Sequence, residues 1–136
     1  MMEIKRIILE QLVNEARIAQ ISANINISLD VQSTGHSSAQ RFRHKEDTKI
    51  IITNPDIREV VEKAKNDIAF YIVQGDIQDG VDFVISDKTG NKKISLAIIP
   101  QEDTPYHWNL IVRTVFSELA QGEPFRVGRN QLHIKV

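Results

Sequence analysis

The stretch Tyr106–Phe116, Y-H-W-N-L-I-V-R-T-V-F, decides the fold class of this 136-residue chain. Its apolar and polar side chains alternate, which is the pattern of a β-strand with one buried face. The apolar parity, which we expect to pack against helices, holds Trp108, Leu110, Val112 and Phe116. The polar parity holds His107, Asn109 and Arg113, together with Ile111 and Val115. The polar face should therefore be partly apolar or partly covered.

Further strands are predicted on either side of this stretch. Residues 24–31 alternate in the same way, and residues 81–86, 92–99 and 125–136 have strand composition. Turn signals separate them at Gly90 and at Gly122-Glu123-Pro124, and residues 100–105 read as a loop. Short connections between consecutive strands favour an antiparallel order.

Helices are predicted mainly before the sheet. Residues 2–22 have amphipathic spacing, and a short helix is expected between residues 37 and 44. The segment T-N-P-D-I-R-E-V-V starts a helix at Thr53 or Asn54, with Pro55 in the first turn, and this helix should end before Gly75.

The predicted fold class is α+β, in one domain spanning residues 1–136. Residues 1–75 should be mainly helical with one strand at 24–31, and residues 80–136 should form the sheet. We expect the N-terminal helices to pack on one face of an antiparallel sheet of four to five strands.

Composition excludes several classes of function. The net charge is −1, so nucleic-acid binding would need a local basic patch. With no cysteine, the chain has no disulfides and no thiolate chemistry. We find no metal-binding histidine spacing, no glycine-rich phosphate loop and no Gly-x-Ser-x-Gly motif, so no metal or cofactor is expected. Without a long apolar segment, we expect a soluble cytoplasmic protein with no membrane contact.

The segment Ser33–Lys45, S-T-G-H-S-S-A-Q-R-F-R-H-K, has the composition of an anion-binding site. Its cations and imidazoles are His36, Arg41, Arg43, His44 and Lys45, and it contains no acidic residue. A helix that starts near Ser37 or Ser38 would add unpaired amide groups next to these cations.

The sheet carries a second group of cations and imidazoles, namely His107, Arg113, Arg129, His133 and Lys135. If helices cover the apolar face, the opposite face presents these residues together. An antiparallel sheet commonly has one solvated face, however, and such a face carries polar residues without any function. Both interpretations remain open from the sequence.

Three motifs occur in an order similar to that of a known superfamily. They are H-S-S-A-Q-R-F-R-H at 36–44, D-I-R-E-V-V-E-K-A at 56–64 and L-I-V-R-T-V-F at 110–116. In this order the chain resembles the barnase–EndoU–colicin–RelE-like superfamily of small ribonucleases, especially its phage and toxin members.

The resemblance implies metal-independent endoribonuclease activity, in the host cytoplasm if the protein is phage-encoded. The ribose 2′-hydroxyl attacks the adjacent phosphorus and leaves a cyclic phosphate. The implied proton-transfer residues are His36, His44, His107 and His133, because histidine titrates near neutral pH. The implied phosphate-binding residues are Arg41, Arg43, Lys45, Arg113 and Arg129.

The alternative is a non-catalytic interaction module. An immunity, antitoxin-like or virion-associated protein would bind a protein partner, and the nearly neutral charge favours this class. A related alternative is a protein of ribonuclease fold that binds RNA without cleaving it.

Overall fold

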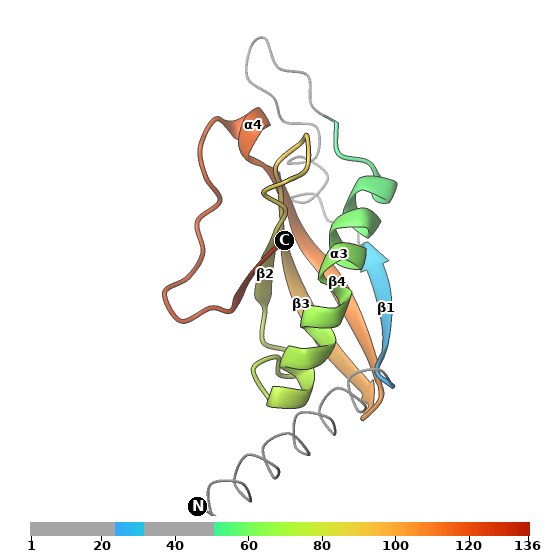
Figure 1. Ribbon diagram of the computed structural model, residues 1–136. Coiled ribbons are helices and arrows are strands. Elements are labelled where there is room, and N and C mark those ends of the chain that lie inside the picture. The colour runs from blue at the N-terminus through green and yellow to red at the C-terminus, as the bar shows by residue number, and fades with distance from the viewer. Residues whose placement is uncertain (1–23, 32–50) are drawn as a thin grey trace, which may run out of the picture.

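The computed structural model describes residues 24–31 and 51–136 (Figure 1). The helices predicted at 2–22 and 37–44 lie outside these residues, as does the segment Ser33–Lys45. The described elements are β1 (Asn26–Val31), α3 (Asn54–Gln74), β2 (Phe83–Ser86), β3 (Ile94–Thr104), β4 (His107–Ser117), α4 (Glu118–Gln121) and β5 (His133–Lys135).

The strands form one mixed five-stranded sheet in the order β1-β4-β3-β2-β5. Strands β2, β3 and β4 are antiparallel, as predicted, but β1 pairs in parallel with β4 and β5 pairs in parallel with β2. The predicted arrangement of N-terminal helices on an antiparallel sheet is therefore wrong. In the described part of the chain the main helix follows β1, and the sheet is antiparallel only at its centre. The coarser α+β class is consistent with this arrangement.

The two parallel pairings lie at the edges of the sheet. Among the described elements α3 comes next after β1, and β1 pairs with β4. At the other edge, residues 122–132 carry the chain back along the sheet, so β5 enters in the direction of β2 (Figure 1). The predicted strand at 125–136 is thus confined to His133–Lys135, and the predicted loop at 100–105 largely continues β3 to Thr104.

Helix α3 begins and ends where its sequence signals predict. Thr53 and Asp56 form a capping box, in which the Thr53 side chain accepts from the Asp56 amide and the Asp56 carboxylate accepts from the Thr53 amide. Pro55 stands in the first turn, and Gly75 ends the helix with φ of 83°, a left-handed conformation that favours glycine.

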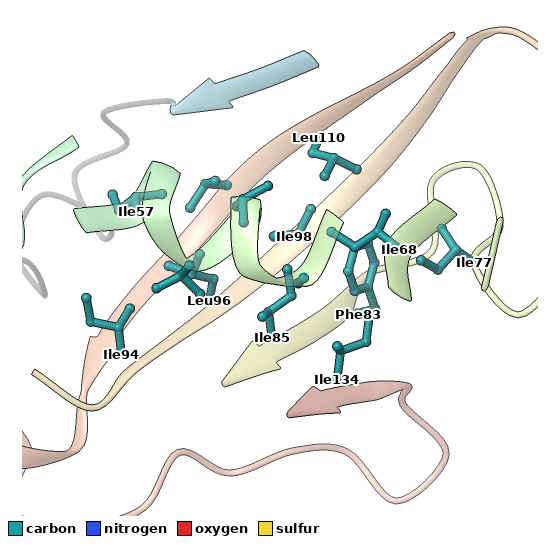
Figure 2. Packing of buried hydrophobic residues seen from close by; sticks show 14 of the residues in the cluster. Ile57, Ile68, Ile77, Phe83, Ile85, Ile94, Leu96, Ile98, Leu110 and Ile134 are labelled. Atoms are coloured by element: carbon teal, nitrogen blue, oxygen red, sulfur yellow. The ribbon is translucent and has the colours of Figure 1, made fainter. Parts of the chain in front are cut away.

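The core lies between α3 and one face of the sheet. Figure 2 shows Ile57 and Ile68 of α3 among side chains from several strands, including Leu96 and Ile98 of β3. On this face the largest fully buried side chains of the sheet are Phe83, Ile85, Leu96, Ile98, Leu110, Val112 and Val115. Burial of this apolar surface is the main stabilising contribution to the fold.

A β-bulge at Arg113 reverses the parity of the last part of β4. Ala97 pairs with Thr114 and Ile98 with Val112, so Arg113 is an extra residue. Val115 therefore lies in the core under α3, fully buried. Phe116 moves to the opposite face, where its ring centroid lies 5.2 Å from that of Phe125. The prediction that Phe116 faces the helices is wrong for this reason.

The bulged register predicts that Val115 contributes more to the stability of the fold than Thr114 does. Val115→Thr should lower the free energy of unfolding by about 1–3 kcal/mol, because it places a hydroxyl without a partner in the core. Thr114→Val, on the other face and half-buried, should change it by less than about 0.5 kcal/mol. Urea unfolding followed by circular dichroism measures both. Equal effects of the two substitutions would contradict the bulged register.

Candidate functional site

Two serine–histidine pairs lie on the sheet face opposite α3, one at each parallel edge. Ser28 Oγ of β1 lies 2.7 Å from His107 Nε2 of β4, and Ser86 Oγ of β2 lies 2.6 Å from His133 Nε2 of β5. The registers explain why both pairs form. Asn26 pairs with His107 and Val84 with His133, so each serine is two residues further along, diagonal to its histidine. In both cases a hydroxyl and an imidazole on the same face meet across parallel strands.

At the β1–β4 edge a carboxylate completes the arrangement. Asp103 Oδ2 lies 2.9 Å from His107 Nδ1, and the Ser28 hydroxyl is hydrogen-bonded to the other ring nitrogen, Nε2. Glu102 pairs with Trp108 and Thr104 with His107, so Asp103 is the extra residue of a bulge next to the β3–β4 turn. This bulge brings the Asp103 carboxylate to the imidazole. The imidazole is held at both nitrogens, which fixes its orientation.

The Ser28–His107–Asp103 group borders a hollow of about 370 Å³ that is also lined by Gln101, Glu102 and Asn109. The His107 side chain is 38% exposed and that of Asp103 is 69% exposed. Acidic side chains are concentrated here, since Asp79 accepts a hydrogen bond from the Glu102 amide, and Asp30 lies exposed on β1. The hollow is therefore polar, open and negatively charged.

The pair at the β2–β5 edge has a different environment. Ser86 and Ser95 are buried, and their hydroxyls lie 2.8 Å apart, so Ser86 links Ser95 to His133. Burial lowers the pKa of His133 below the ordinary value of 6.5, and the positive charges of Lys135 and Lys88 lower it further, against an opposing effect of Glu118. The His133 imidazole is therefore neutral at pH 7, beside two cations.

The two histidines are too far apart to act on one phosphodiester. His133 pairs with Val84, Val84 with Ala97, and His107 with Thr104. Three strand spacings and seven residues along β3 separate them, which is about 28 Å. The structure thus provides two separate candidate sites, one at each edge of the sheet.

The other predicted site residues have varied positions. Arg113 is exposed at its bulge, about 20 Å along β4 from His107 but only three strand spacings, about 14 Å, from His133. Arg129 is exposed and borders a small hollow with Asp76 and Asp82. The remaining predicted residues, His36, Arg41, Arg43, His44 and Lys45, lie outside the described residues.

A third polar cluster lies between the start of α3 and the β2–β3 turn. The Asp87 carboxylate, 5% exposed, binds Lys63 Nζ at 2.8 Å and accepts from the Thr89 and Gly90 amides. Burial tends to raise the pKa of Asp87, but the Lys63 ammonium and these donors outweigh it and lower that pKa. Lys92 binds Asp56 at 2.6 Å in the same region. Every named carboxylate is bonded, so the cluster joins α3 to the turn.

No group of three or more histidine or carboxylate side chains within 24–31 and 51–136 is arranged to hold a metal ion. In the same ranges, no helix has both the length and the apolar character needed to cross a bilayer. No family model, curated protein or solved structure is significantly similar to the chain. The candidate sites must therefore be interpreted from their own geometry.

Sequence reasoning named both sheet histidines but missed Ser28, Ser86 and Asp103. Ser28 is 79 residues from His107, and only the parallel β1–β4 pairing brings them together. One local signal was present, because Asp103 and His107 flank the Thr104-Pro105-Tyr106 turn four residues apart. Because residues 100–105 were interpreted as a loop, Asp103 was not connected with His107.

Asp87 should stabilise the fold above its unfolded pKa. Because the folded pKa is lowered from 3.8, this contribution is complete above about pH 4 and is lost as the pH falls further. Asp87→Asn should lower the free energy of unfolding at pH 7 by about 1–3 kcal/mol, and its difference from wild type should shrink towards pH 2. Asp67→Asn, exposed on α3, is the control and should have little effect. A constant difference across this range would contradict the pKa direction.

His133 should make stability depend on pH in a different window. Its folded pKa lies below 6.5, so its contribution is complete above pH 6.5 and is lost as the pH falls through the folded pKa. His133→Asn should therefore be most destabilising near pH 7.5 and less so near pH 5. Urea midpoints at both values measure this, with Asn130→Ala as a control in the same segment. A deficit that grows on acidification would show that the pKa is raised instead.

Proposed function

We propose that this protein is a small metal-independent endoribonuclease that binds RNA along the β2–β5 edge. The observation that supports this most is the His133 imidazole, which is neutral at pH 7, half-buried and next to Lys135 and Lys88. A neutral imidazole accepts the proton of a ribose 2′-hydroxyl, and neighbouring cations stabilise the phosphate as negative charge develops on it. Cleavage then yields a 2′,3′-cyclic phosphate and a 5′-hydroxyl.

The last segment of the chain is basic, which suits a polyanion. From Phe125 to Val136 the chain has three cations, Arg126, Arg129 and Lys135, and no acidic residue. All three are exposed. The β1–β4 edge, with Glu102, Asp103 and Asp30, would repel RNA. His133 is for this reason a better candidate than His107 for the proton transfer.

The segment Ser33–Lys45, which lies outside the described residues, belongs to the same proposal because of its composition, with two imidazoles, three cations and no acidic residue. His36 or His44 would be the second proton-transfer residue, with Arg41 and Arg43 on the phosphate.

A non-catalytic binding module is the second candidate, and one observation favours it. Both described histidines are bonded to serines that tie parallel strands together, which is a structural use of an imidazole. In that case His133 maintains the edge of the sheet and performs no chemistry.

The decisive experiment is cleavage of labelled RNA in excess chelator. Wild type should cleave and leave a cyclic phosphate, and His133→Asn, His36→Ala or His44→Ala should reduce the rate about 10²- to 10⁴-fold. The rate should rise with pH through the lowered pKa of His133. Lys65→Gln, on the exposed side of α3, should cleave like wild type. Absence of cleavage by folded wild type would favour the binding module.

The RNA-binding surface has its own test. Lys135→Gln should weaken binding of a non-cleavable RNA and lower the slope of log K against log salt by about one phosphate contact. Lys65→Gln is the matched removal of a lysine and should leave the slope unchanged. Equal slopes for wild type and Lys135→Gln would exclude the β2–β5 edge as the binding surface.

A further inference from the structure

We propose that Ser28, His107 and Asp103 form a second catalytic site, in which Ser28 is an acylated nucleophile and the substrates are small neutral or cationic esters. The proposal rests on the order of the contacts. Ser28 Oγ lies 2.7 Å from His107 Nε2, and Asp103 Oδ2 lies 2.9 Å from His107 Nδ1. This is the order needed for an imidazole to take the serine proton while a carboxylate holds its tautomer and stabilises the imidazolium.

The pair at the other edge shows what distinguishes a reactive arrangement from a structural one. Ser86 has the same diagonal relation to His133, but its residue is only 2% exposed and it is bonded to Ser95. No carboxylate of the described residues is hydrogen-bonded to His133. Ser28, by contrast, is exposed on β1 and its histidine has Asp103. Of these two pairs, the one at the β1–β4 edge has both an accessible hydroxyl and an oriented base.

The backbone next to Ser28 offers a donor for a developing oxyanion. Asn26 donates its amide to the Tyr106 carbonyl, so the amides of alternate residues, Ser28 included, point towards β4. The intervening amides, including that of Leu29, point away from β4. Since β1 is the last strand at this edge of the described sheet, the Leu29 N–H is directed to the open edge. It is the amide that follows the nucleophile, a position that often supplies an oxyanion donor.

Two hollows border Ser28 on opposite faces of the sheet, and only one of them can hold the substrate. The polar hollow beside His107 lies on the face that carries Ser28 Oγ, whereas a groove of about 700 Å³, lined by Ile27 and Leu29 among others, lies on the α3 side. A substrate that reacts with Ser28 Oγ therefore lies in the polar hollow. Glu102 and Asp103 border this hollow, so an anionic leaving group or acyl chain is disfavoured. Neutral and cationic esters are the chemistry that remains.

The reaction balances with water as the only co-reactant. Ser28 Oγ bonds to the ester carbonyl carbon as its proton moves to His107 Nε2, and the carbonyl oxygen becomes negative. The C–O bond to the leaving alcohol breaks, and that alcohol takes the proton from Nε2. Water then adds to the acyl–Ser28 ester through the same base, releasing a carboxylic acid and restoring the serine.

The experiment uses full-length protein with a fluorophosphonate probe and p-nitrophenyl acetate, at pH 7.5. We expect one covalent adduct, mapped to Ser28 by mass spectrometry, and ester hydrolysis with turnover. Ser28→Ala should lose the adduct, His107→Asn should slow labelling about 10²- to 10⁴-fold, and Asp103→Asn should slow it about tenfold or more. A thiocholine ester should be hydrolysed faster than p-nitrophenyl hemisuccinate.

Asp67→Asn is the matched control, because Asp67 is exposed on α3, borders neither hollow at Ser28, and its removal changes the charge as Asp103→Asn does. It should be labelled at the wild-type rate. Circular dichroism confirms that each variant is folded. No adduct on folded wild type, an adduct on another residue, or labelling of Ser28 that is unaffected by His107→Asn would each overturn the proposal. Since the RNA assay uses other residues, either activity can fail without affecting the other.

Discussion

The antiparallel pairing of β3 with β4 is the constraint on which the rest of the structure depends. It is the longest pairing in the sheet, eleven residues in each strand, and its buried face receives α3. Its two irregularities, at Arg113 and Asp103, determine which side chains reach each face. The first sends Val115 into the core and Phe116 to the far face. The second brings a carboxylate onto His107. A regular pairing would give a different core and no Ser–His–Asp arrangement.

Both edges of this central unit are completed by a parallel strand, and the same local geometry arises twice. Along each strand, side chains on one face of the sheet recur every two residues. In both parallel pairs the serine lies two residues beyond the residue that pairs with the histidine, and from this diagonal position it comes within hydrogen-bond distance of the imidazole. The environment then separates the two pairs. At β2–β5 the serine is buried, and the imidazole lies near Lys135 and Lys88, with Glu118 opposing their effect. At β1–β4 the serine is exposed and the imidazole faces carboxylates.

Local features of this fold were predictable because their causes are local. The capping box at Thr53 and the glycine at position 75 mark the ends of α3, and the turn at Gly90 marks the β2–β3 hairpin. The wrong predictions depend on distant contacts. Alternation could not reveal the bulge at Arg113, because an extra residue appears only when the partner strand is known. Likewise, β1 and β4 are separated by α3 and a hairpin, and nothing in residues 24–31 specifies a parallel partner. Ser28 was therefore missed although His107 was identified.

The nearly neutral net charge conceals an uneven distribution of charge, and this bears on what each edge can bind. The exposed cations Lys135, Arg126 and Arg129 belong to the C-terminal segment, where Arg129 lies beside Asp76 and Asp82, whereas Glu102, Asp103 and Asp30 lie near the other edge. Electrostatic steering acts on these local fields rather than on the sum of −1, because screening at physiological salt limits their range to about 8 Å. The edges are about 28 Å apart at the two histidines, so each presents its own potential. Net charge alone is therefore a poor argument against nucleic-acid binding for this chain. At the β1–β4 edge it is the local carboxylates, and not the net charge, that disfavour such binding.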